Sequence, residues 1–147
     1  MLVLLGFETI ANICTSAEGL TYLSDNTEQF YNAMRTSGQM VQSSIEEQIK
    51  KRILGAMCVL FGSDNATTNH SVSARKEKAY RNISQNPLAL LMKAAKQPFP
   101  AVRCSSLEVL GNLVVYPWIE QDMAITPGIG SFFPQMSFST DGLGQEK

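Results

Sequence analysis

A helical motif that occurs three times is the feature that most restricts how this chain can fold. Each copy places one small residue between two large apolar ones: Ile10-Ala11-Asn12-Ile13, Leu54-Gly55-Ala56-Met57 and Leu110-Gly111-Asn112-Leu113. A small side chain on a helix lets a neighbouring helix approach closely, because the distance between two helix axes depends on the side chains at their contact. The motif therefore predicts helices that pack in the same way at each copy.

The spacing of the three copies indicates a repeat. Ala11 and Gly55 are 44 positions apart, and Gly55 and Gly111 are 56 positions apart. The first interval matches the period of armadillo and HEAT repeats, about 40–47 residues, and the second leaves room for a long loop. We expect an all-α fold, an armadillo/HEAT-like α-solenoid fragment of about three helical repeats. An ordinary helical bundle is the alternative, because apolar helices resemble one another by chance.

Helical periodicity also dominates the rest of the chain, and no segment alternates as a strand would. Helices are predicted over about 2–14, 18–23, 25–38, 44–61, 75–81, 86–96 and 100–116, with a short one around Trp118. Residues 1–126 are interpreted as the α-helical repeat segment. Residues 127–147, which are rich in glycine and interrupted by proline, are interpreted as an irregular or disordered C-terminal tail.

Local signals mark several helix ends. Two capping boxes, each with Ser or Asp followed three residues later by Glu, predict helix starts at 25–28 and 44–47. Asn86 is placed to cap the next helix, with Pro87 at its first position. Gly62 is placed to end a helix in a left-handed turn.

Apolar stripes at helical spacing predict which sides face the core. For the helix after Ser44 the stripe is Ile49, Ile53, Ala56, Met57 and Leu60. For the helix after Pro100 it is Cys104, Leu107, Gly111 and Val114. We expect Lys50, Lys51 and Arg52 to be directed mostly away from the first of these stripes.

The cysteine and histidine content argues against a metal centre or a nucleophilic site. The chain has three cysteines without C-x-x-C spacing and a single histidine, His70, so a four-ligand zinc site is not expected, and neither is a cofactor. Cys14 and Cys58 occupy the same repeat position and are predicted to be small buried hydrophobes. A small hydrolase that uses Cys58 or Cys104 is an alternative, but His70 falls in a polar loop predicted from 62 to 71, away from the apolar stripes.

The odd cysteine count, without a secretory signal, favours a reducing compartment, the cytoplasm, with the nucleus as a second location.

Charge is distributed unevenly along the chain. Residues 50–103 carry ten basic and two acidic side chains, whereas the flanks carry a surplus of nine acidic ones, which brings the whole chain to −1. The basic residues that could bind a partner are Lys50, Lys51, Arg75, Lys76, Lys78 and Arg81, with Arg52 beside them. Such charges would mainly steer association with an acidic protein surface, and the alternative is a solvated helix face. Nucleic-acid binding is a weaker interpretation, because the patch has no interleaved aromatics.

From Asn86 to Gly128 the sequence resembles a known family. The segments Asn86-Pro87-Leu88-Ala89-Leu90-Leu91, Gln97-Pro98-Phe99-Pro100, Arg103-Cys104-Ser105-Ser106-Leu107, Tyr116-Pro117-Trp118 and Thr126-Pro127-Gly128 occur in this order. In this order and spacing they resemble the C-terminal part of proteins of the 26S proteasome non-ATPase regulatory subunit 5 family. The members of this family are armadillo/HEAT-like proteasome assembly chaperones. The likeness covers about residues 4–133. The residues of the family motif, Gln97, Pro98, Phe99, Pro100, Pro117 and Trp118, are expected to have a structural role, with Trp118 as an interface anchor in a minority interpretation.

The resemblance implies a non-catalytic chaperone of the regulatory particle base. In this family a curved α-solenoid holds the C-terminal domain of one ATPase subunit, orders base assembly and leaves the finished complex. It also implies a longer chain, with further repeats before Met1, so that this sequence is expected to be a fragment or truncated form. The alternative is a generic armadillo/HEAT adaptor whose basic patch meets an acidic protein or RNA.

Overall fold

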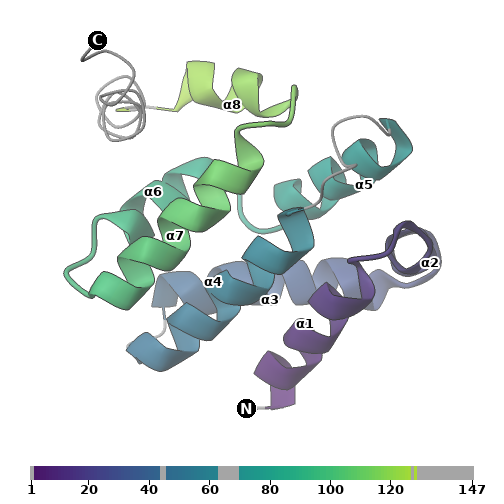
Figure 1. Ribbon diagram of the computed structural model, residues 1–147, viewed down its shortest axis with the longest axis horizontal. Coiled ribbons are helices and arrows are strands. Elements are labelled where there is room, and N and C mark those ends of the chain that lie inside the picture. Colours follow the sequence, from purple (N-terminus) through teal and green to yellow (C-terminus); the bar gives the residue numbers. More distant parts are fainter. Residues whose placement is uncertain (1, 44–45, 63–69, 127, 129–147) are drawn as a thin grey trace, which may run out of the picture.

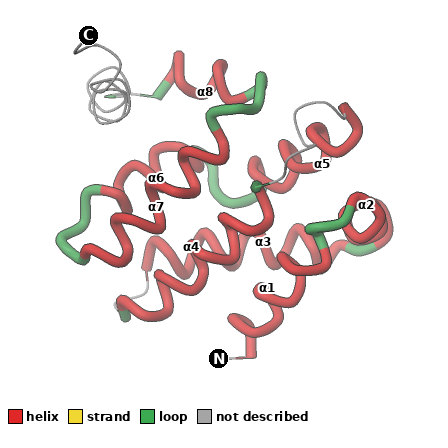
Figure 2. The backbone as a smooth tube through the Cα atoms, in the orientation of Figure 1, coloured by secondary structure: helices red, strands yellow, loops and turns green. Residues whose placement is uncertain are grey.

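The computed structural model describes residues 2–43, 46–62, 70–126 and 128. Within these residues the chain forms eight α-helices and no strand (Figure 2). The helices are α1 (Leu2–Ile13), α2 (Ala17–Asn26), α3 (Glu28–Ser43), α4 (Glu47–Phe61), α5 (His70–Arg81), α6 (Pro87–Ala95), α7 (Pro100–Leu113) and α8 (Ile119–Ile125). The all-α prediction is confirmed. The predicted tail, 127–147, lies outside the described residues apart from Gly128.

Helices three apart in the chain stack on one another. α1, α4 and α7 lie side by side in one layer, with α3 and α6 behind them (Figure 1). α2 packs against α5 in the same way. The helices α2–α3–α4 and α5–α6–α7 are thus two successive three-helix units, α1 matches the third helix of a unit, and α8 follows where a first helix would be. This packing confirms the predicted segment of a helical repeat.

A single apolar cluster runs through the stack. Phe30, Phe61, Tyr80, Leu88 and Leu110 are almost completely buried in it, one from each of α3 to α7. Each fully buried large apolar side chain contributes on the order of 2 kcal/mol. The repeat therefore shares one core, and no unit buries its apolar side alone.

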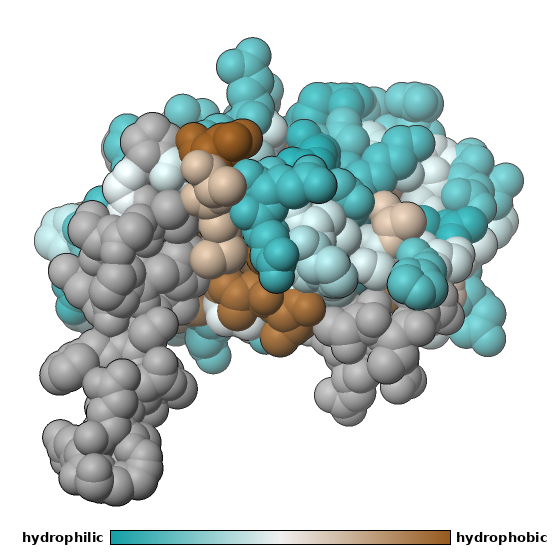
Figure 3. Space-filling model, turned by 90° about the horizontal axis from the view of Figure 1, so that it is seen from above, coloured by the Kyte–Doolittle hydropathy of each residue, from teal (hydrophilic) through white to brown (hydrophobic). Residues whose placement is uncertain are grey.

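Apolar side chains are exposed at the end of the stack that carries α8. Val114 and Val115, which follow α7, are 38% and 57% exposed, and Ile125 at the end of α8 is 73% exposed. Figure 3 views the molecule from this end and shows hydrophobic side chains among the hydrophilic ones. In a stack of this kind, an apolar end is the side onto which a further unit packs.

The cap signals are confirmed at α6 and corrected at α3. The Asn86 side chain accepts a hydrogen bond of 3.2 Å from the Ala89 N–H, and Pro87 is the first helical residue, as predicted. The predicted start at Asp25 is wrong, because α2 continues to Asn26 and Thr27 accepts from the Phe30 N–H instead, at 3.4 Å. The Asp25 carboxylate forms an ion pair with Arg75.

The ends of α4 also differ from prediction. Gly62 has φ −84° and ψ 129°, so the predicted left-handed turn is wrong and the chain leaves α4 in an extended conformation. A Cβ there would lie 2.9 Å from the Cys58 carbonyl oxygen of α4 and 3.0 Å from the Asn112 amide of α7, so the position is tight on both sides. Ser44 of the predicted capping box lies outside the described residues, and Glu46 precedes α4 without a side-chain cap.

The predicted inward face of α7 is wrong. Cys104 and Gly111 are exposed, and Leu107 and Val114 are 37% and 38% exposed. The side that faces α4 and α6 is formed by Val102, Ser106, Val109, Leu110 and Leu113. α7 is apolar on two sides, and its neighbours determine which of them is covered. Ser106 is accommodated in the core because its hydroxyl donates to the Val102 carbonyl at 2.8 Å.

The small residues at which the backbone is most tightly packed are not the glycines of the motif. Ala11 is buried, but a Cβ added at Gly55 or Gly111 would meet nothing within 4 Å, so the prediction is wrong for both glycines. Backbone is close at Gly19 and Gly38 instead, where an added Cβ would collide with the carbonyl oxygens of Ile13 and Ile83.

Candidate protein-interaction surface

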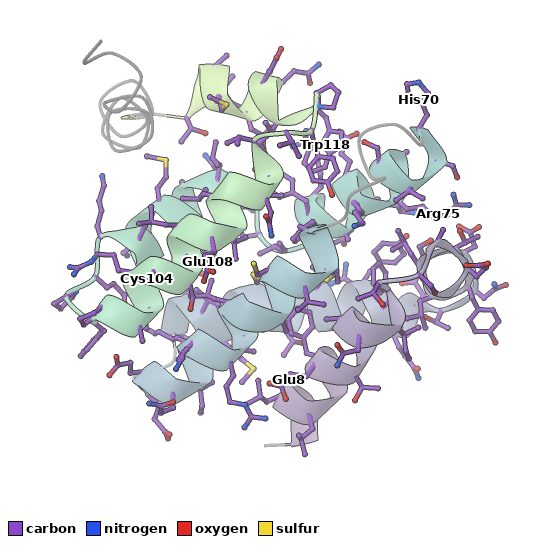
Figure 4. The ribbon with its side chains drawn as sticks, in the orientation of Figure 1. Glu8, His70, Arg75, Cys104, Glu108 and Trp118 are labelled. Atoms are coloured by element: carbon purple, nitrogen blue, oxygen red, sulfur yellow. The ribbon has the colours of Figure 1, made fainter. Side chains whose placement is uncertain are left out.

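The outer side of the first layer extends over three stacked helices, and we call it the α1–α4–α7 face. Its exposed and half-buried residues point away from the core: Leu5, Glu8 and Asn12 on α1, Lys51, Arg52, Gly55 and Val59 on α4, and Cys104, Glu108 and Gly111 on α7. Figure 4 labels Glu8, Cys104 and Glu108, which mark its two ends. The two glycines leave stretches of helix backbone uncovered, onto which a partner could pack closely.

A hollow of about 330 Å³ lies in this face between α1 and α4. Small residues form part of its lining, namely Ala11, Gly55 and Ala56. The Arg52 guanidinium and the Glu8 carboxylate lie at its edge and form an ion pair of 2.6 Å. Both side chains are partly exposed, so solvent screens this pair and it adds little to stability. The hollow can receive an apolar side chain of a partner.

The junction between α4 and α7 is tied by an amide. The Asn112 side chain donates to the Cys58 carbonyl at 3.0 Å and lies 3.1 Å from the Cys58 sulfur. Glu108, one turn before Asn112 on α7, adds a negative charge near Cys58.

A charged position recurs along this face. Glu8, Arg52 and Glu108 each precede the small residue of the motif by three positions, so the layer presents alternating charges. Sequence reasoning missed this position, although the constant offset is visible in the sequence.

The three thiols occupy different environments. Burial raises the pKa of Cys14 to about 12. Partial burial, followed by the charge of Glu108, raises the pKa of Cys58. Cys104 is exposed. A nucleophilic cysteine needs a lowered pKa, and His70, the first residue of α5, is exposed (Figure 4). These environments argue against the hydrolase alternative for Cys58, and they confirm burial for Cys14 but only in part for Cys58.

We predict a corresponding order of thiol modification. In the folded protein at neutral pH, 5,5′-dithiobis(2-nitrobenzoate) is expected to modify Cys104 first and Cys14 only after denaturant is added. The reaction requires that the thiol ionise to a thiolate and that the reagent reach it. The absorbance of the released thionitrobenzoate measures the rates. Cys104→Ser should remove the fast phase. Rapid modification of Cys14 in the native protein would contradict its burial between the helices.

The predicted partner-binding residues on α5 are engaged within the fold. Arg75 pairs with Asp25 at 2.7 Å, and Lys78 lies over the Tyr31 ring, 4.7 Å from its centroid. Arg81 pairs with Glu77 and with Asp122. Lys76 is 1% exposed, and its burial lowers the pKa of its ammonium group.

On α4, the expectation that all three basic residues point away from the core is wrong for Lys50. It is 9% exposed and donates to Gln97 Oε1 at 3.2 Å, whereas Lys51 is exposed. Of the six basic residues, two lie on α4 and four on α5, and all but Lys51 are buried or engaged within the fold. Their role in partner binding stays a prediction.

The family-motif residues lie at two corners of the stack. Gln97, Pro98 and Phe99 connect α6 to α7, which begins at Pro100 as predicted. Phe99 is 41% exposed, so its ring is not part of the buried core. The hydrogen bond from Lys50 to Gln97 connects this corner to α4 of the preceding unit.

The second corner, Tyr116-Pro117-Trp118, joins α7 to α8. The Trp118 ring stacks on Tyr116 with centroids 4.9 Å apart, and its indole N–H donates to the Ser73 hydroxyl at 3.0 Å. Tyr116 in turn donates to the Phe61 carbonyl at 2.5 Å. This corner links α4, α5 and α8.

Comparison with known proteins identifies the family. A sequence model described as the proteasome non-ATPase 26S subunit matches residues 1–137. The chain belongs to the proteasome non-ATPase 26S subunit family. The resemblance seen over about residues 4–133 is thus confirmed. No curated protein and no solved structure matches the chain.

Membership in the family indicates proteins of the proteasome as partners. In the described part of the chain, no helix has both the length and the apolar character needed to cross a bilayer. The described residues likewise contain no cluster of three metal-ligating side chains.

Proposed function

We propose that the chain is a non-catalytic assembly chaperone of the 26S proteasome regulatory particle base that binds the C-terminal domain of an ATPase subunit. The observation that carries the proposal is the family match over residues 1–137. The repeat stack adds a physical reason, since a solenoid offers a long preformed surface and needs little ordering when it binds. The cytoplasm and the nucleus are the proposed locations.

The α1–α4–α7 face is the proposed contact surface. It combines exposed apolar residues, Leu5 and Val59, with the hollow between α1 and α4 and with charges of both signs. A folded domain held there would have that part of its surface covered, and competing subunits could not bind it until the chaperone left. The generic adaptor alternative has less support, because most of its basic residues are engaged within the fold.

Titration calorimetry with the isolated C-terminal domains of the base ATPases tests the proposal. We expect one domain to bind selectively. Val59→Glu on α4 should weaken that binding by at least about tenfold, because it places a charge beside the hollow. Ile125→Glu is the matched control, since Ile125 is an exposed aliphatic residue on α8. Equal, weak binding of all domains would refute the chaperone role, and equal effects of both variants would refute the assigned face.

A further inference from the structure

A groove lies on the second layer, between α3 and α6. Figure 1 shows these two helices behind the layer of α1, α4 and α7. The groove consists of two adjoining hollows of about 340 and 390 Å³ that share Gln42, Ser84 and Gln85. The α3 helix forms one wall, α6 forms the other, and the turn over 82–86 lies between them. We call it the α3–α6 groove, and its lining is Arg35, Gln39, Gln42, Arg81, Asn82, Ile83, Ser84, Gln85, Asn86, Ala89, Leu90 and Lys93.

The lining of the α3–α6 groove is positively charged. Among the described residues that line it are two arginines and a lysine and no carboxylate. Arg81 is balanced by Glu77 and Asp122. Arg35 donates to Asn82 Oδ1 at 2.6 Å and to Asn32, which are neutral amides and leave its charge uncompensated. Within the described residues, neither Arg35 nor Lys93 forms an ion pair with a carboxylate, so these two side chains carry the uncompensated positive charge of the groove.

The α3–α6 groove also offers polar groups suited to a peptide backbone. Gln39, Gln42 and Gln85 are exposed amides, and each amide can donate to a carbonyl and accept from an N–H. From Arg35 to Gln42 the α3 wall spans seven residues, or about 10 Å at 1.5 Å per residue. An extended chain advances about 3.3 Å per residue, so roughly three residues of a ligand would reach along this wall from Arg35 to Gln42. Beyond Gln42 the ligand would continue over the second hollow, which Lys93 lines.

We propose that the α3–α6 groove binds an extended, acidic segment of a partner protein. The carboxylates of that segment pair with Arg35 and Lys93, and the glutamine amides bind its backbone. Charge complementarity selects the ligand, and the hollow selects an extended chain over a folded surface. This site is separate from the surface proposed for the chaperone role, so one could fail while the other stands.

Fluorescence anisotropy with the whole chain tests the proposal. The probe is a fluorescein-labelled peptide of sequence Gly-Asp-Glu-Asp-Glu-Gly, and Gly-Asn-Gln-Asn-Gln-Gly is its uncharged counterpart. We expect binding of the acidic peptide alone. Arg35→Gln and Lys93→Gln should each weaken it by about three- to fivefold, and the double variant by about tenfold or more.

Arg103→Gln is the matched control, because Arg103 is exposed on α7 and outside the groove. It should leave the affinity unchanged. Circular dichroism checks that the variants fold. If Arg35→Gln does not fold, the affinity of Lys93→Gln alone tests the site, since Lys93 is exposed and its replacement should not affect folding. An equal loss with Arg103→Gln would overturn the site in favour of general electrostatic attraction. Tighter binding of a short oligouridine than of the acidic peptide, or no peptide binding, would also overturn it.

Discussion

Gly38→Ala is expected to lower the free energy of unfolding by about 3 kcal/mol, which is large for the addition of one methyl group. Gly38 lies inside α3, where alanine would normally be favoured. An added Cβ would collide with the carbonyl oxygen of Ile83, which belongs to the turn before α6. Because backbone cannot rotate out of the way as a side chain can, α3 and the turn must separate.

Gly55→Ala is the matched control for this prediction. Gly55 is also inside a helix, α4, but an added Cβ has open space around it. Alanine there should stabilise the protein by about 0.5–1 kcal/mol through helix propensity. Urea denaturation followed by circular dichroism measures both variants. If both alanines stabilised the protein, the close approach of α3 to the Ile83 turn would be disproved.

Asp122→Ala is expected to be the second severe substitution, with a loss of about 3 kcal/mol. Asp122 on α8 is 6% exposed, accepts from the Tyr80 hydroxyl at 2.6 Å and pairs with Arg81 at 2.7 Å. Removing the carboxylate leaves a buried hydroxyl and a partly buried cation without this partner. Both groups belong to α5, so the substitution loosens α8 from the unit before it.

Two further variants separate the contributions to this site. Tyr80→Phe should cost only about 1 kcal/mol, since it removes one hydrogen bond and keeps the ion pair. The double variant should lose less than the sum of the two single losses, because both single changes break the same bond. The fluorescence of Trp118, the one tryptophan of the chain, reports the local effect, since its ring stacks on Tyr116 beside Tyr80. Additive losses would contradict a direct Tyr80–Asp122 bond.

The helices are predictable because their signals are local. Apolar spacing locates α4, and Asn86 with Pro87 locates the start of α6. The start of α3 is misplaced by the same reasoning because the Asp25 side chain binds Arg75, which is 50 positions away in sequence. A capping motif does not reveal such a competing partner.

Packing between helices determines which side of α7 is buried and whether Lys50 and Lys76 are exposed. Periodicity cannot rank Leu107 against Leu110 when a helix is apolar on two sides, and only Leu110 is buried in the structure. Lys50 and Lys76 are expected at the surface as charged residues, yet their long aliphatic stems are covered by neighbouring helices. The α1–α4–α7 face is created by the stacking of units, so the sequence alone does not predict it. The sequence shows only the charged residue that stands three positions before the small residue of each motif copy.

The stacking of each helix on its counterpart three places earlier has a consequence for how the molecule opens. Such a chain behaves as a linear array, in which inner units have neighbours on both sides and outer ones have one. Amide hydrogens in α4, which packs against α1, α3 and α7, should exchange with deuterium more slowly than those in α1 or α8. Opening would then proceed inward from the termini, and a ligand that spans two units would slow it by joining them.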